Sequence, residues 1–160
     1  LRRGGGSRVR YPPPHSPGDG GEPWPQVDGA GDAPAVVYPN GNKVFYLAQG
    51  TETAGTFGLY RWEFAGPESG PGAHFHRTIT ESFYVLEGTV TIYDGTAWVK
   101  CHAGDFAHVP AGGIHGFRNT SAGPAALLIH LKSRLLLPRT PLITATLSLE
   151  LLHDLMDRAA

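Results

Sequence analysis

Short runs of β-branched and aromatic residues recur along most of this chain, and they restrict its possible folds more than any other feature. The runs fall at residues 35–38, 43–48, 56–64, 81–86, 89–94, 97–101, 105–110, 115–119 and 125–132, with Gly, Pro and Asn between them. Regularly spaced short strands divided by turn residues are typical of antiparallel sandwiches and barrels. We therefore expect an all-β fold. Glu87-Gly88 and Asp94-Gly95 lie between runs, where tight hairpin turns are expected.

The two ends of the chain differ from the rest in composition and in the spacing of apolar residues. Residues 1–34 hold eight Gly and seven Pro, so they have too little apolar surface to offset the entropy of ordering and predict an irregular arm. Residues 134–147 are an apolar connector interrupted by proline. Residues 148–158 have the apolar spacing of a helix, with Ser148 as its N-cap. The expected organisation is an arm at 1–34, a barrel at 35–133, and a connector with a short C-terminal helix at 134–160.

Composition excludes several classes of partner. The 160 residues suit one domain, and a net charge of −1 with 17% charged residues does not suit a nucleic-acid-binding or polybasic membrane surface. No apolar run is long enough to cross a bilayer, and the basic start lacks the apolar stretch of a signal peptide. One cysteine, Cys101, excludes an internal disulfide. We expect a cytoplasmic protein. It begins with Leu1, which indicates trimming or an unusual start.

The stretch HFHRTITESFYVLEG, residues 74–88, places three metal-ligand types close together. His74 and His76 are two residues apart, so on a strand both face the same side. Glu81 follows five residues after His76, which would turn it to the other side of a continuous strand. A bend within 77–80 would let Glu81 open a second strand and face the same point. Two imidazoles and a carboxylate suit a divalent transition metal that keeps open positions for a substrate.

A second stretch, GDFAHVPAGGIHGFRN at residues 104–119, adds a further histidine after turns at 104–105 and 110–113. Together the two stretches resemble both halves of the cupin signature. The first half, G-x5-H-x-H-x4-E-x6-G, is matched by His74, His76, Glu81 and Gly88, although Glu68 stands where the first glycine belongs. The second half, G-x5-P-x-G-x2-H-x3-N, is matched at every position by Gly104, Pro110, Gly112, His115 and Asn119.

The resemblance implies a double-stranded β-helix, the jelly-roll barrel of cupins, with one metal ion inside it. The implied ligands are His74, His76, Glu81 and His115, and the implied ion is Fe, Ni, Cu, Mn or Zn. By the same resemblance, Gly88 is a hairpin glycine with positive φ. Pro110 and Gly112 shape the turn that delivers His115, and Asn119 braces the strand that follows.

Aromatic residues near the ligands are candidates for binding a substrate. Tyr60, Trp62 and Phe64 alternate and so share one face of a strand, while Phe83 follows Glu81 and Phe117 follows His115. As a group they predict a lining for an apolar or aromatic small molecule. Taken singly, each of them is better interpreted as barrel core. His108 and His130 lie in strand-like runs and are interpreted as surface or internally hydrogen-bonded histidines rather than ligands.

The chain is similar to small quercetinase-like cupins, which implies a metal-dependent dioxygenase acting on a polyphenol or another oxygenated aromatic. In those proteins the ligand glutamate also takes the substrate proton, so Glu81 is expected to be both ligand and catalytic base. Two alternatives remain open: a polyketide cyclase or isomerase that uses the metal without O2, and a non-catalytic binding or sensor protein. Cupin barrels commonly pair, and the apolar connector fits an interface, so a homodimer is expected.

Overall fold

The computed structural model describes residues 29, 31–53, 55–67 and 69–133, and these residues form an all-β fold without a helix. The nine strands are β1 (Val36–Val37), β2 (Lys43–Ala48), β3 (Gly58–Phe64), β4 (Ile79–Glu87), β5 (Thr89–Tyr93), β6 (Trp98–His102), β7 (Phe106–Val109), β8 (Gly116–Arg118) and β9 (Ala125–Ser133). Each overlaps one of the runs expected from the sequence. The predicted C-terminal helix, the connector and most of the N-terminal arm lie outside the described residues.

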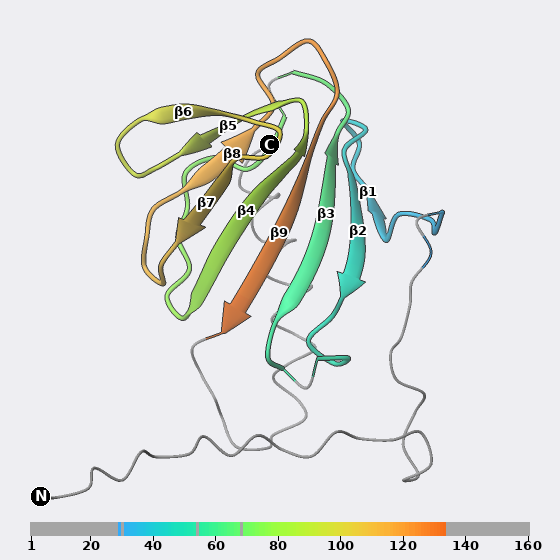
Figure 1. The fold of residues 1–160 in the computed structure, drawn as a ribbon, viewed down its shortest axis with the longest axis vertical. Helices are drawn as coiled ribbons and strands as arrows, with labels where there is room; N and C mark the ends of the chain where they lie inside the picture. Colours follow the sequence, from blue (N-terminus) through green and yellow to red (C-terminus); the bar gives the residue numbers. More distant parts are fainter. Residues whose placement is uncertain (1–28, 30, 54, 68, 134–160) are drawn as a thin grey trace, which may run out of the picture. The chain divides into compact units, whose positions relative to one another are not determined.

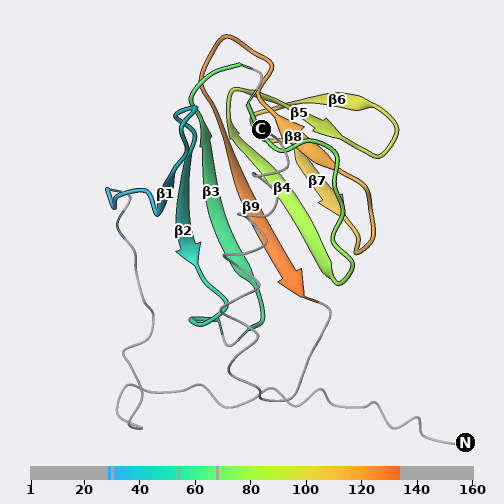
Figure 2. The same ribbon diagram turned by 180° about the vertical axis from the view of Figure 1, so that it is seen from behind.

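The strands form two antiparallel sheets. One has six strands in the order β1-β2-β3-β9-β4-β7, and the other has three in the order β6-β5-β8. Figures 1 and 2 show the smaller sheet beside the β4–β7 end of the larger one. Residues 69–74 run antiparallel to β8 and extend the smaller sheet, with bridges between Ser69 and Asn119 and between His74 and His115.

The inner face of the six-stranded sheet is arranged in rows set by the strand register. Gly58, Leu131 and Glu81 form one row across β3, β9 and β4, and Val109 of β7 continues it. Alternate residues of β3 and β4 are buried, as expected for strands with one face toward the core. The second row contains Tyr46, Tyr60, Ile129 and Phe83, and the third contains Val44, Trp62, Leu127 and Val85.

The expected hairpin at Glu87-Gly88 is wrong. Strand β4 pairs with β7 and β9, whereas β5 pairs with β6 and β8, so Gly88 is a corner at which the chain passes from one sheet to the other. The positive φ expected for Gly88 is confirmed at 69°. A strand-turn-strand pattern is the same for a hairpin and for a corner, because the difference lies in which distant strands complete each sheet.

The other expected turns are present. Tyr93 pairs with Trp98, so Asp94-Gly95 lies in a four-residue hairpin loop between β5 and β6. Gly104 has a φ of 96° in the turn before β7, and Gly112 has a φ of 85° in the turn before His115. Asn119 is buried and organises the turn after β8, because its Oδ1 accepts a hydrogen bond from the Ser121 backbone and its Nδ2 donates one to Gly123.

No helix long and apolar enough to cross a membrane occurs within the described part of the chain.

Candidate metal centre

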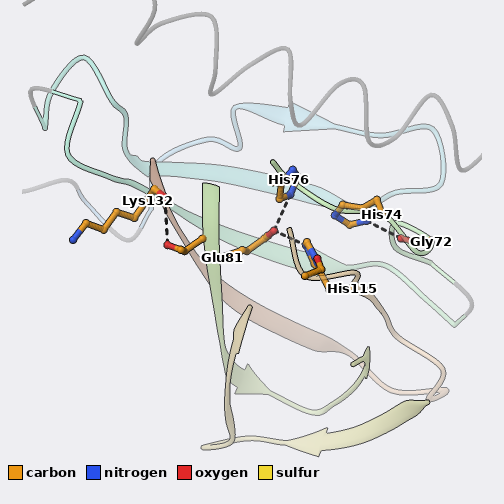
Figure 3. A network of polar contacts seen from close by, with 8 residues as sticks. Gly72, His74, His76, Glu81, His115 and Lys132 are labelled. Carbon is orange, nitrogen blue, oxygen red and sulfur yellow. Dashed lines mark hydrogen bonds and ion pairs between the residues drawn. The ribbon is translucent and has the colours of Figure 1, made fainter. Parts of the chain in front are cut away.

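The four residues expected to be ligands come together inside the barrel (Figure 3). The ligand atoms of His74, His76, Glu81 and His115 all lie within 4.8 Å of one another. His76, Glu81 and His115 are buried, and His74 is half-buried. Nitrogen and oxygen ligands lie about 2.0–2.2 Å from a transition metal, so those on opposite sides of one ion are about 4 Å apart. The cluster therefore needs only small adjustments to surround a single ion.

Backbone pairing places His74 next to His115. The N–H of each donates to the C=O of the other, with both N···O distances 2.8 Å. Next to this bridge, a Cβ on Gly116 would lie 2.8 Å from the Gly72 oxygen, so the two segments approach too closely for a side chain. The Gly112 N–H donates to the His76 oxygen at 2.7 Å, which ties the turn before His115 to the first ligand pair. Three histidines from two distant segments are thus held by the backbone.

A bend at Arg77-Thr78 resolves the odd spacing between His76 and Glu81, as expected. Strand β4 begins at Ile79, two residues earlier than the sequence suggested, and its inward residues include Glu81 and Phe83. The bend lets the carboxylate approach from the six-stranded sheet while His74 and His115 approach from the extended smaller sheet.

Hydrogen bonds to the backbone fix two of the rings. The Nδ1 atom of His74 lies 2.7 Å from the Gly72 oxygen, and that of His115 lies 3.0 Å from the Gly113 oxygen. A carbonyl oxygen can only accept, so both Nδ1 atoms are protonated and each ring directs Nε2 into the cluster. The Nε2 atom of His74 is buried and has no hydrogen-bond partner among the described residues.

This unpartnered nitrogen is the best test of whether the site fits a metal. Burial is the main reason that the pKa of His74 falls to about 4, so at neutral pH its Nε2 carries a free lone pair. A buried acceptor without a partner costs about 1–3 kcal/mol. A metal ion would supply the missing partner, so the residues fit a metal.

Glu81 joins the other two imidazoles. Its Oε2 lies 3.0 Å from His76 Nε2 and 2.8 Å from His115 Nε2. Burial raises the pKa of the Glu81 carboxyl, but hydrogen bonds from His115 and His76 outweigh this and lower it to about 2. Burial lowers the pKa of His115, but its hydrogen bond to Glu81 and the charge of that carboxylate raise it overall. Glu81 Oε2 thus contacts both His76 Nε2 and His115 Nε2, and all three atoms could bind the same ion.

The five aromatic residues expected to bind a substrate are all buried, but at different depths. Phe83 lies next to the ligands, with its ring 6.0 Å from that of His115, and Tyr60 shares its row. Phe117 contacts Phe83 at 5.2 Å between ring centroids and Trp62 at 5.3 Å. Rows are about 6.7 Å apart along a strand, which places Trp62 about 13 Å and Phe64 about 20 Å from the row of Glu81. Trp62 and Phe64 therefore pack as core.

The two histidines interpreted as non-ligands lie outside the cluster. His108 is exposed and its Nδ1 lies 3.0 Å from the Ser82 hydroxyl, while His130 is half-buried against the ring of Phe57. The carbonyl oxygens of Gly72 and Gly113, which orient His74 and His115, could not be predicted from the sequence. Every residue has a backbone carbonyl, so residue type does not show which carbonyl accepts a hydrogen bond. It also did not reveal Tyr46, which faces inward beside Tyr60.

Comparisons with known proteins agree with this geometry. Residues 60–131 match the cupin domain family. A stretch of 45 residues is 42% identical to quercetin 2,3-dioxygenase of Bacillus subtilis (strain 168), and it covers 28% of this chain but only 13% of that enzyme.

Two solved structures are similar in fold. A protein from Thermus thermophilus is 28% identical, with a TM-score of 0.54 over 63% of this chain and 91% of the other. A predicted oxalate decarboxylase from Thermotoga maritima is 22% identical, with a TM-score of 0.55 over 57% of this chain and 80% of the other. The second likeness shows the fold alone.

Proposed function

We propose that the chain is a metal-dependent cupin enzyme, in its concrete form a dioxygenase acting on a polyphenol or another oxygenated aromatic; the match of residues 60–131 to the cupin domain family supports this. The observation that supports this most is the convergence of three imidazoles and one carboxylate, in which His74 Nε2 is buried without a partner among the described residues. A set of three histidines and one glutamate leaves coordination positions open for a substrate.

The roles of the residues follow from their contacts. His74, His76, His115 and Glu81 would hold the ion, with His74 and His115 oriented by their Nδ1 hydrogen bonds to Gly72 and Gly113. A bound Fe, Ni, Cu, Mn or Zn ion would supply Lewis acidity toward a substrate oxygen, and the redox-active members of this group would also support reaction with O2.

Glu81 is the proposed base. Hydrogen bonds from His115 and His76 keep the carboxyl ionised at neutral pH, which is the protonation state that a base requires. Oε2 would accept the proton of a substrate hydroxyl whose own pKa a bound metal ion would lower. The carboxylate is on the inner face of β4, between Ile79 and Phe83, and a strand fixes its position better than a loop would. Phe83 belongs to the buried apolar core next to the carboxylate, and these apolar side chains would limit the access of water to the proton transfer.

The oxygen-dependent form of the proposal is supported by the partial similarity to quercetin 2,3-dioxygenase. A cyclase or isomerase would use the same ligands without O2, so oxygen consumption separates the two. The test is oxygen uptake by the full chain, loaded in turn with each of the five metals and supplied with quercetin.

Glu81→Gln should retain folding and lose oxygen uptake by about 10²- to 10⁴-fold, the usual contribution of a positioned base. His108→Gln, on the exposed side of the barrel, is the matched control and should leave uptake unchanged. Full activity in Glu81→Gln would show that Glu81 is not the base. No uptake by the wild-type chain with any of the metals would contradict the dioxygenase and favour the cyclase or binding alternatives.

A further inference from the structure

Two tyrosines form a phenol pair on the inner face of the six-stranded sheet. Tyr46 of β2 and Tyr60 of β3 are cross-strand partners, and their rings meet edge to face with centroids 5.3 Å apart. Tyr60 is fully buried and Tyr46 packs against the same core cluster. The pair lies one row from Glu81 on a sheet whose inner face also carries the carboxylate ligand.

The hydroxyl of Tyr60 reaches toward the metal-site end of the barrel. Its ring fills the space left by the missing side chain of Gly58, because a Cβ on Gly58 would lie 2.6 Å from the Tyr60 hydroxyl. Gly58 pairs with Leu131, and Leu131 pairs with Glu81. Neighbouring strands are about 4.8 Å apart, so this row places the Tyr60 hydroxyl about 10 Å across the sheet from the Glu81 backbone, and Tyr46 on β2 lies one strand farther, about 14 Å across the sheet from Phe83. That span is comparable to a substrate of two or three rings.

The hydroxyl of Tyr46 is buried and has no hydrogen-bond partner among the described residues. Burial and the neighbouring Tyr60 raise the pKa of Tyr46 above its usual range, so the group keeps its proton and remains a donor. A buried donor without a partner is unfavourable, and proteins retain few of them. A phenylalanine at position 46 would avoid this cost, because it differs from tyrosine only in lacking the hydroxyl.

We propose that Tyr46 is a substrate-positioning residue, whose hydroxyl donates a hydrogen bond to an oxygen on the part of the substrate farthest from the metal. This inference rests on the proposed function and specifies its substrate class further. The site would prefer aromatic substrates that carry two separated oxygen groups, one that binds the metal and one that meets the Tyr46–Tyr60 pair.

The first measurement needs no substrate. Tyr46→Phe removes only the hydroxyl, so the thermal midpoint of the full chain should stay the same or rise by a few degrees, with and without metal. Tyr84→Phe is the matched control, because Tyr84 is 43% exposed on the outer face of the same sheet, and it should change nothing. A fall in the midpoint of Tyr46→Phe would show that the hydroxyl serves a bond within the protein and would overturn the assignment.

The second measurement compares the affinities of metal-loaded wild type and Tyr46→Phe for quercetin and for 3-hydroxyflavone, which keeps the metal-binding oxygens but lacks the other hydroxyls. We expect Tyr46→Phe to weaken quercetin binding by about 2- to 10-fold and to leave 3-hydroxyflavone binding unchanged. Equal weakening of both ligands, or of neither, would overturn the assignment. If wild type binds neither ligand, the proposed polyphenol substrate is wrong and the assignment of Tyr46 fails with it, whereas binding by wild type that Tyr46→Phe leaves unchanged overturns the assignment of Tyr46 alone.

Discussion

The corner at Gly88 allows a sharp test of how the two sheets are joined. Gly88 has a φ of 69°, and a Cβ built on it would lie 2.2 Å from the backbone oxygen of Pro124 and 3.0 Å from the Ala125 Cα. Gly88→Ala therefore meets two separate obstacles. A left-handed conformation costs an L-residue about 1–2 kcal/mol. Displacing the backbone before β9 adds about 1–3 kcal/mol, as for other overpacked sites.

Together these effects predict a loss of about 2–5 kcal/mol, which for a barrel of about 100 residues lowers the thermal midpoint by roughly 10 °C or more. Gly104→Ala is the matched control. Gly104 also has a positive φ, of 96°, but a Cβ there would meet no described atom within 4 Å. Urea and thermal unfolding of both variants separate the two costs. If Gly104→Ala is as destabilised as Gly88→Ala, the close approach at the corner is not what requires glycine.

Two further predictions concern pH and assembly. The pKa of His74 is about 4 in the folded chain, below its ordinary value of 6.5, so below pH 6.5 the unfolded state binds a proton that the folded state does not. The metal-free protein should therefore lose stability as pH falls from about 6.5 to 4, which urea unfolding would show. The decline should be shallower in His74→Gln, where Glu81 and His115 still titrate, and unchanged in His108→Gln, and this pattern would support the assignment. An unchanged decline in His74→Gln would contradict it. We also propose that the chain is a homodimer, and light scattering after size exclusion should give the mass of two chains at micromolar concentration, whereas a monomer alone would refute this.

Much of the fold could be predicted from local sequence. All nine strands in the described part of the chain overlap runs of β-branched and aromatic residues, and the alternation of Tyr60, Trp62 and Phe64 correctly predicts their shared buried face. These features depend on residue type and on the two-residue period of a strand, both of which are visible locally. The ligand cluster was also predictable, because the two motifs resemble the cupin signature and that resemblance implies that His74, His76, Glu81 and His115 meet.

Features set by contacts between distant segments could not be predicted. The corner at Gly88 depends on β4 pairing with β9 rather than with β5. The depth of Trp62 in the barrel, and the place of Tyr46 beside Tyr60, depend on the register between strands and on the irregularity between Tyr46 and Ala48 in β2. A one-residue change of register would turn these side chains to the other face, and local composition does not specify it.

The central claim is that His74, His76, Glu81 and His115 bind one transition metal ion. The most direct test is the metal content of the full chain, measured by elemental analysis after loading and removal of excess metal. We expect one ion per chain in the wild type and in His108→Ala, and loss of that ion in His74→Ala/His115→Ala, with circular dichroism confirming that the barrel remains folded. A folded wild type that retains none of the five metals, or a double variant that still retains one ion per chain, would contradict the account.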